Sequence, residues 1–447
     1  MRLLSRRMMG VIQITSKIKL FVLASIFVFT YSKHEEYAGW KSYYINTSTV
    51  EQVKKLNAIR TKLGLDFLSP AHVKREALVL AKPEQQEEFK NNLDHLGIKY
   101  RIHVDDIKSA LDHDDEKKKN RTKAIARDSG DKMSYDDYQH LETIDAYMEY
   151  IAKEYPKTTT LVTAAQTFEG LPIRYMQIST TNFKDNSKPV IFIEGGMHAR
   201  EWISPPTVTW VIKKLTEDVT EPDLLNYFDW ILMPIANPDG YNFTFFGRRL
   251  WRKNRSMNFP NDNFCPGVDG NRNFNIAWNT VGTEEDPCSG IYAGNGPFSE
   301  IETQVVRNII MEHISRIALY LSMHSFGSLI LHPWSHNLTL SYNYDNLAKV
   351  GHAIANAFFE HGPDIFPPFI VGSTSELLYL CSGSSTDYGH HIGVPLAYTI
   401  ELPGIAPNDD YTGFDMDPQY IKAVCESTWA GIVVGARKAK VLFRKGT

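Results

Sequence analysis

The residues best suited to chemistry are a histidine and a glutamate three positions apart, His198 and Glu201, within the stretch Glu-Gly-Gly-Met-His-Ala-Arg-Glu-Trp. An imidazole and a carboxylate at this spacing can bind one zinc ion. The spacing alone is weak evidence, because His113 and Glu116 repeat it inside a charged run that we interpret as a solvated linker. His198 and Glu201 instead follow the apolar run 189–193 and two glycines, which predicts a buried strand ending in a turn. Ligands at the carboxyl end of such a strand would face a cleft.

A catalytic zinc needs a third protein ligand and a free coordination position, and two histidines with one carboxylate are a well-attested set for peptide hydrolysis. The candidate third ligand is His324, which follows the apolar run 317–323 and precedes Ser325. A single histidine at a strand end is more often structural than metal-binding. The assignment therefore depends on the rest of the chain.

Four further segments carry side chains that suit the same chemistry. They are the segment with Arg249 and Arg252 beside a tryptophan, the segment Gly-Val-Asp-Gly-Asn-Arg-Asn with Asp269, Asn271 and Arg272, a Ser/Gly-rich loop preceded by Tyr379, and a strand-like run ended by Glu401. Each segment alone has an ordinary interpretation, as solvated arginines, turn residues or a surface glutamate.

Together and in this order, these segments resemble the zinc metallocarboxypeptidases of the A/B type. The resemblance extends from about Trp40 to about Val441, and the motifs HxxE, RLWRKxRS, GVDxNRN, HS and the late strand glutamate carry it. It implies one zinc ion bound by His198, Glu201 and His324. It further implies Asp269 as the hydrogen-bond acceptor for His198, Glu401 as general base, Arg252 as electrophilic partner, Asn271 and Arg272 as the carboxylate clamp, and Arg249, Ser325, Tyr379 and Thr386 as other substrate contacts.

The side-chain chemistry is consistent with these roles. An exopeptidase that acts at a carboxyl terminus must recognise a free carboxylate, and the fork of an arginine such as Arg272 matches a carboxylate bidentately. Zinc lowers the pKa of its bound water toward about 7, so a carboxylate such as Glu401 can take the proton and later deliver it to the leaving amine. A cation such as Arg252 can stabilise the developing oxyanion, an effect worth roughly 3–4 kcal/mol per donor in other hydrolases.

Composition indicates an ordinary globular enzyme with an accessory segment. The chain has 447 residues, of which 43% are hydrophobic and 22% charged, so it can bury a large core and form two or three domains. Its formal net charge is −4, and no basic stripe with interleaved aromatic residues occurs. We expect no nucleic-acid partner.

The N-terminus is typical of a signal peptide, residues 1–32. Basic residues precede the apolar run 20–31, which at about a dozen residues is shorter than the roughly 20 of a spanning helix. We expect cleavage near Ser32, secretion to the extracellular space and no membrane association of the mature protein. The long basic stretch before the apolar run leaves an uncleaved membrane anchor as the alternative.

Other features are consistent with the secretory route. Acceptor motifs for N-glycosylation occur at Asn46, Asn120, Asn242, Asn254 and Asn337. The family resemblance pairs Cys265 with Cys288 in a disulfide. Cys381 and Cys425 are either two buried thiols or a second pair.

Residues 35–110 predict a separate α+β domain. Strand-like runs begin at Trp40, Ala77 and Ile98, and two helices are indicated, one opened by a capping box at Ser48-Thr-Val-Glu51 and one from Pro83 to Leu96. This βαββαβ-like order suits a small antiparallel sheet with two helices on one face. The resemblance implies an inhibitory pro-segment that folds over the active-site cleft.

A charged connector, residues 111–127, follows. Blocks of charge stay solvated and accessible to proteases, so we expect an activating protease to cut after a basic residue, Arg127. Residues 128–447 would then form the catalytic domain, in which alternating helix and strand patterns predict a mixed, mostly parallel sheet covered by helices.

Substrate preference depends on the pocket for the terminal side chain. The resemblance places Thr386 where basic-specific members carry an acid. Because a terminal Lys or Arg would then lack a countercharge, we expect release of neutral apolar or aromatic residues from peptide and protein C-termini.

The alternative to an enzyme is a secreted or membrane-anchored zinc-binding interaction protein without catalysis. It would need Arg252, Arg272 or Glu401 to be missing, and all three are present. We expect a monomer. The sequence does not identify the physiological substrate, the activating protease or the glycosylated sites.

Overall fold

The computed structural model of the chain describes residues 33–73, 75–125, 133–257, 265–404, 413–414 and 416–445. The predicted signal peptide, residues 1–32, and the predicted cleavage site at Arg127 lie outside these residues. Within the described ranges, no helix is both long enough and apolar enough to cross a membrane.

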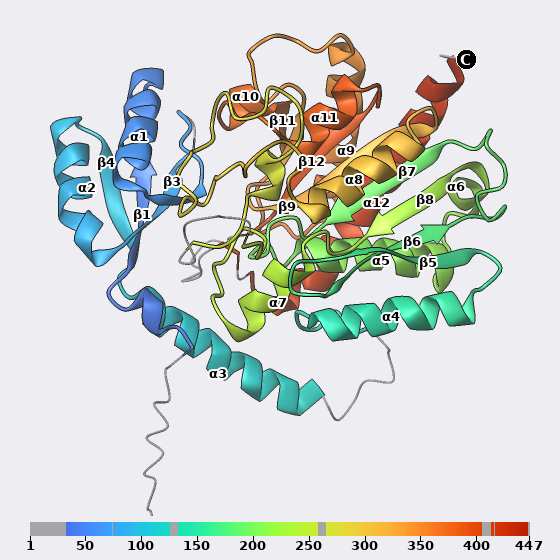
Figure 1. Cartoon of the computed structure of the whole chain (residues 1–447), viewed down its shortest axis with the longest axis horizontal. Coiled ribbons are helices and arrows are strands. Elements are labelled where there is room, and N and C mark those ends of the chain that lie inside the picture. Colours follow the sequence, from blue (N-terminus) through green and yellow to red (C-terminus); the bar gives the residue numbers. More distant parts are fainter. Residues whose placement is uncertain are drawn as a thin grey trace, which may run out of the picture. The chain divides into compact units, whose positions relative to one another are not determined.

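The N-terminal domain has the predicted βαββαβ order, and its second strand, Asp66–Ser69, is one that the sequence pattern did not locate. After a short 3-10 turn, η1 (Glu35–Tyr37), it contains β1 (Lys41–Asn46), α1 (Val50–Leu63), β2 (Asp66–Ser69), β3 (Ala77–Ala81), α2 (Pro83–His95) and β4 (Lys99–Val104). The strands form an antiparallel sheet in the order β2-β3-β1-β4. Apolar side chains of α1 and α2 pack together on one face of this sheet, which confirms the predicted small α+β domain (Figure 1).

The N-cap of α1 lies one residue later than predicted. The Thr49 hydroxyl accepts the amide proton of Gln52, and the Gln52 side chain accepts that of Ser48. Thr49 is in an extended conformation and is the N-cap, and Glu51 lies in the first helical turn.

The connector is a helix, α3 (Ile107–Ile125), through most of the segment predicted to be solvated. Opposite charges four residues apart, such as Asp114 and Lys118, favour the helix. The buried side chain of Asp114 and the Lys118 ammonium, 4.2 Å from the Trp202 ring centroid, lie on its packed side. The interpretation of this run as a solvated linker was therefore wrong for its first part, because charge alternation was compatible with a packed helix.

The C-terminal domain is built on one mixed sheet of eight strands in the order β11-β10-β12-β9-β7-β8-β6-β5. Its strands are β5 (Thr159–Gln166), β6 (Pro172–Ile178), β7 (Val190–Gly195), β8 (Asp229–Met233), β9 (Ile317–Ser325), β10 (Leu329–His332), β11 (Ile370–Ser373) and β12 (Ala397–Leu402). Strands β8, β7, β9 and β12 are neighbours and run parallel. The predicted mixed, mostly parallel sheet is thus present.

Helices cover both faces of this sheet (Figure 1). They are α4 (Leu141–Glu154), α5 (Ser204–Thr216), α6 (Pro222–Tyr227), α7 (Pro238–Phe246), α8 (Ile301–Glu312), α9 (Tyr344–His361), α10 (Thr374–Leu377), α11 (Ser385–His391) and α12 (Ile421–Lys445), with 3-10 turns η2 (Gly270–Arg272) and η3 (Pro418–Tyr420). Apolar residues of α4, α5, α9 and α12 form the core on one face, and those of α8 and α11 contribute to the core on the other.

Three of the central parallel strands end at one edge of the sheet and bring candidate site residues together. The chain leaves β7 through Gly196, whose φ of 64° suits glycine, and reaches His198 two residues later. His324 lies near the end of β9, directly opposite Glu401 of β12 in the strand register. Parallel pairing of β9 and β12 therefore places the candidate ligand His324 beside the candidate base Glu401.

The four cysteines divide as one bridge and two thiols. Cys265 and Cys288 form a disulfide, as the resemblance implied. Cys381 and Cys425 are separate buried thiols, which decides the question that the sequence left open.

The glycosylation motifs differ in exposure. Asn254 is buried, and its amide donates hydrogen bonds to Glu300 and Glu302, so a glycan on Asn254 is incompatible with this fold. Asn46, at the end of β1, is exposed.

Candidate active site

Three buried side chains converge at the carboxyl ends of β7 and β9. Nδ1 of His198 lies 2.7 Å from one carboxylate oxygen of Glu201, and Nδ1 of His324 lies 2.9 Å from the other. The two Nδ1 atoms are 3.0 Å apart. Among the described residues, this is the group of acidic, histidine or cysteine side chains whose ligand atoms all lie within 4.8 Å of one another.

The donor set fits a zinc ion. The outer nitrogen of His198 lies 3.0 Å from Asp269, and the outer nitrogen of His324 lies 2.9 Å from the Ser322 hydroxyl. Both inner nitrogens therefore face the Glu201 carboxylate, an arrangement that a cation between the three groups would stabilise. Burial opposes ionisation of Glu201, but the two histidines outweigh it and lower the pKa of Glu201 well below its usual range. Nitrogen and carboxylate oxygen are ligands that zinc prefers.

The Asp269 carboxylate connects this group to the neighbouring cations. One oxygen accepts from His198 and from the backbone amide of Asn271, at 3.0 Å each. The other accepts two hydrogen bonds from Arg252, through Nε at 3.1 Å and Nη2 at 2.9 Å. Burial disfavours the charge of Asp269, but Arg252 and His198 outweigh it and hold its pKa well below the usual range.

Arg272 is held rigidly on the same side of the cleft. Its guanidinium donates to the Asn271 carbonyl at 2.8 Å, to the Gly282 carbonyl at 3.0 Å and to the Tyr379 hydroxyl at 3.1 Å. The Asn271 side-chain oxygen accepts the amide proton of Ser385. These contacts fix a planar cation and a neighbouring amide beside Tyr379.

Glu401 lies in β12 and lines the same cleft. Burial, together with the nearby Glu201 carboxylate, raises the pKa of Glu401 to about 7. A cation between the three ligands would oppose this shift. Glu401 therefore lines the cleft beside the ligand group, in position to take or deliver a proton there.

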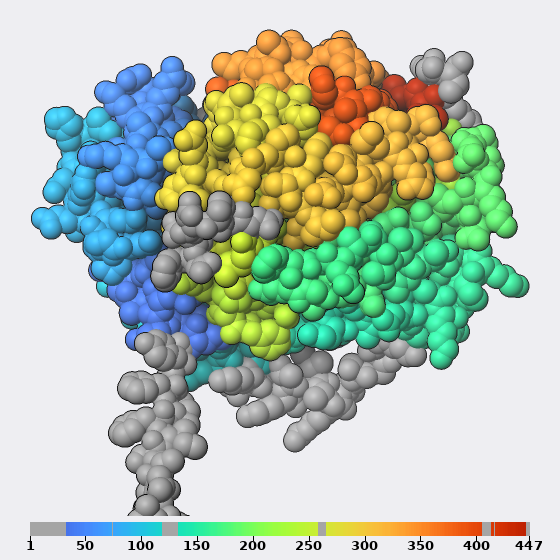
Figure 2. Space-filling model, in the orientation of Figure 1, coloured from blue at the N-terminus to red at the C-terminus, as the bar shows by residue number. Residues whose placement is uncertain are grey.

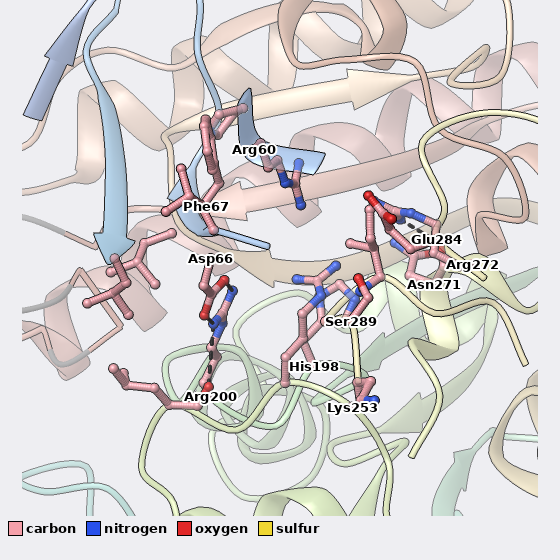
Figure 3. A pocket seen from close by; sticks show the side chains of 18 of the residues that line it. Arg60, Asp66, Phe67, His198, Arg200, Lys253, Asn271, Arg272, Glu284 and Ser289 are labelled. Carbon is pink, nitrogen blue, oxygen red and sulfur yellow. Dashed lines mark hydrogen bonds and ion pairs between the residues drawn. The ribbon is translucent and has the colours of Figure 1, made fainter. Parts of the chain in front are cut away.

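The cleft has a volume of about 570 Å³, and residues of both domains line it. His198, Asn271 and Arg272 lie on the C-terminal domain, and Arg60, Asp66 and Phe67 project from the N-terminal domain (Figure 3). The N-terminal domain, blue in Figure 2, lies against the yellow segment of the C-terminal domain. That segment includes cleft-lining residues between 284 and 291.

A two-pronged ion pair between the domains joins Asp66 and Arg200. The two Nη atoms of Arg200 donate to the Asp66 carboxylate at 2.6 and 3.1 Å (Figure 3). Arg200 is buried, and it lies between the two ligands of the HxxE motif. We did not predict a role for Arg200 or Asp66, although the cation inside the motif was a visible signal.

The other predicted site residues differ in position. Ser325, Tyr379 and Thr386 line the cleft, and their roles as substrate contacts stay predictions. Arg249 does not: it is buried, donates to the carbonyls of Arg200 and Phe414 at 2.9 and 2.7 Å, and stacks on the Trp202 ring. In this structure the Arg249 side chain turns into the core while that of Arg252 lines the cleft, so the substrate contact at Arg249 stays a prediction.

Comparison with known proteins agrees with this geometry. The sequence profile of zinc carboxypeptidases matches residues 144–431, and that of the carboxypeptidase activation peptide matches residues 43–114. The chain belongs to the zinc carboxypeptidase family. It is a hydrolase that acts on peptide C-termini, its cofactor is zinc, and its N-terminal domain is an activation peptide.

Individual relatives cover almost the whole chain. Carboxypeptidase B of Helicoverpa zea is 53% identical over 96% of this chain and 100% of its own length. The crystal structure of carboxypeptidase A from Helicoverpa armigera is similar with a TM-score of 0.87 and 39% identity, over 91% of this chain and 98% of that one. The crystal structure of thrombin activatable fibrinolysis inhibitor matches with a TM-score of 0.73 and 27% identity, over 90% and 98% of the two chains.

The first prediction separates metal binding from proton transfer. Glu401→Gln should retain about one zinc per molecule and lose on the order of 10²–10⁴ of turnover, the usual contribution of a positioned general base. His198→Ala should lose the metal, because removal of one of three protein ligands weakens the whole site. Metal analysis and activity of the two purified, activated variants check this. A Gln variant without zinc, or with zinc and full activity, would contradict the role of Glu401.

Proposed function

We propose that this zinc carboxypeptidase is secreted as a zymogen and, once cut, releases single neutral C-terminal residues. The observation that carries the proposal is one cleft lined by His198, Glu201, Glu401 and Arg272 and also by residues of the activation peptide. His324 completes the ligand group with His198 and Glu201. The basic and apolar N-terminal residues and the disulfide support secretion.

In the proposed reaction, Arg272, Asn271 and Tyr379 bind the terminal carboxylate of the peptide. Because Arg272 is already fixed by three hydrogen bonds, little side-chain entropy is lost when substrate binds. His198, Glu201 and His324 would hold zinc, which supplies Lewis acidity that polarises the scissile carbonyl and makes water more acidic. Glu401 takes the proton of the attacking water and delivers it to the leaving amine.

Arg252 is the proposed cation for the developing oxyanion. Two of its nitrogens bind Asp269, and its Nη1 atom lies 3.7 Å from Glu201, which aims the guanidinium edge at the ligand group. Asp269 thus holds Arg252 in place before the reaction, so no reorganisation is needed when charge develops.

The activation peptide is proposed to inhibit by occupying the cleft rather than by removing a ligand. Asp66 neutralises Arg200, and Arg75 donates to the Gly327 carbonyl at 2.6 Å, close to the cleft. Apolar residues of β2, β3 and β4 pack against Leu250 and Phe414 of the C-terminal domain. Peptide cannot enter while these contacts persist.

Release is proposed to need cleavage in the connector between Lys117 and Arg127. The first half of α3 is anchored, because Lys118 contacts Trp202 and Asp115 binds Lys33 and His34. Cleavage near Arg127 would separate the two domains covalently, and the contact of Lys118 with Trp202 would then have to dissociate.

The terminal side chain is proposed to enter a neutral pocket. Leu331, Thr374, Leu378, Cys381, Thr386 and Thr399 line the cleft. The Thr386 and Thr399 hydroxyls lie 3.1 Å apart and bind each other. The adjacent carboxylate, Asp387, is buried and turned away, and it accepts hydrogen bonds from Ser335 and His336. The names of the relatives include both carboxypeptidase A and B, so pocket chemistry carries this proposal.

The second prediction concerns that preference. The activated enzyme should release C-terminal Phe, Tyr or Leu at least about tenfold more efficiently, in kcat/KM, than Lys or Arg, because a buried cation would lack a countercharge. Thr386→Asp should shift the ratio toward basic residues, and Thr386→Asn is the matched control without charge. Equal or better release of Lys by the unchanged enzyme would overturn the preference, and an unresponsive Asp variant would show that Thr386 lies outside the pocket.

The third prediction concerns latency. The full-length protein should be nearly inactive and gain activity after trypsin cuts between Lys117 and Arg127, as located by N-terminal sequencing. Asp66→Asn should raise the activity of the uncut protein, because buried Arg200 loses its countercharge and the activation peptide binds less tightly. Glu88→Gln is the control, because it disrupts an exposed ion pair with Lys62 within the activation peptide. An unchanged rate constant after the confirmed cut would exclude an inhibitory segment.

A further inference from the structure

We propose that Glu194 and Ser322 are positioning residues that fix the ring of His324 for metal binding. The two residues form a hydrogen-bonded chain from a buried carboxylate to the outer nitrogen of His324. This inference rests on the proposed assignment of His324 as a zinc ligand.

The strand register places the three residues of this hydrogen-bonded row next to one another. Glu194 of β7 is the direct partner of Ser322 of β9 in the parallel pairing. Side chains two residues apart on a strand share a face, so Ser322 and His324 point to the same side of β9. The Glu194 carboxylate, the Ser322 hydroxyl and the His324 ring therefore form one row at the end of two central strands.

The directions of the hydrogen bonds follow from proton counting. The Ser322 hydroxyl has one proton and donates it to Oε1 of Glu194. Its 2.9 Å contact with Nε2 of His324 then requires the ring to donate through Nε2–H. Nδ1 consequently keeps its lone pair and faces Glu201, at 2.9 Å. The hydrogen bonds from Glu194 through Ser322 thus select the tautomer of the His324 ring that can bind a cation at Nδ1.

The two candidate histidine ligands thus obtain the same orientation in different ways. His198 donates directly to the Asp269 carboxylate, whereas His324 donates to a hydroxyl that a carboxylate holds. Glu194, Ser322 and His324 are all buried, so solvent does not compete for these protons. Tyr320 also donates to Oε1 of Glu194, at 3.1 Å.

The test measures zinc affinity of the full-length protein by competition with a chelator. Ser322→Ala should weaken zinc binding about 10–100-fold, the usual effect of losing a partner of a ligating histidine. Glu194→Gln should weaken it less, because the amide oxygen still accepts from Ser322 but lacks the charge. In the Ser322→Ala background, Glu194→Gln should have no further effect, because Glu194 acts through Ser322.

Tyr320→Phe is the matched control. It removes the other donor to Glu194 and leaves the Ser322–His324 contact. Zinc affinity should therefore stay within about twofold of the unchanged protein, a smaller change than the loss of about 10–100-fold expected for Ser322→Ala. Visible absorption of the cobalt-substituted proteins provides a second measurement, because it reports ligand geometry. It should change for Ser322→Ala and not for Tyr320→Phe. Thermal unfolding of the metal-free variants shows whether each one folds.

Two results would overturn the inference while leaving the proposed function intact. One is an unchanged zinc affinity and cobalt spectrum in Ser322→Ala. The other is an independent, additive effect of Glu194→Gln in the double variant. His324→Ala tests the ligand assignment itself. If this variant binds zinc as tightly as the unchanged protein, His324 is not a zinc ligand and the inference fails with that assignment.

Discussion

The site depends on one buried carboxylate, that of Asp269. Its two oxygens accept hydrogen bonds from His198, Arg252 and the Asn271 amide, so one charge orients a candidate ligand, a candidate oxyanion cation and the turn that carries Arg272. A buried charge is tolerated when it is paired and hydrogen-bonded, and these partners supply both conditions. Loss of this carboxylate would leave Arg252 unpaired in the same place, so the three functions cannot be changed independently.

Parallel strands supply the second constraint. Because β7, β9 and β12 are adjacent and run in one direction, residues near their carboxyl ends meet at one edge of the sheet. The same register that places Glu401 opposite His324 also places Glu194 opposite Ser322. The pairing of the central strands therefore positions the candidate base Glu401 and also the residues Glu194 and Ser322 that hold the His324 ring.

The activation peptide uses the electrostatics of this cleft. The substrate side of the cleft is rich in cations, and Asp66 provides a carboxylate at Arg200, while the apolar face of its sheet covers Leu250 and Phe414. Ion pairs of Asp66 with Arg200 and of Glu36 with Arg248 act together with this apolar contact to hold the activation peptide on the C-terminal domain. A helical connector that packs through Lys118 extends the contact beyond the cleft.

The sequence by itself determined the chemistry: the HxxE spacing, the late histidine and glutamate, the arginine segments and the alternation of apolar runs predicted the ligands, the family resemblance and both folds. These features are short motifs in a fixed order along the chain, so they can be recognised from the sequence alone. Only the tertiary structure decided that Arg249 turns inward, that Cys381 and Cys425 are separate, that α3 packs, and that Asp66 meets Arg200. Each of these depends on contacts between residues far apart in sequence, and spacing along the chain carries no information about which face a side chain takes once strands and domains pack.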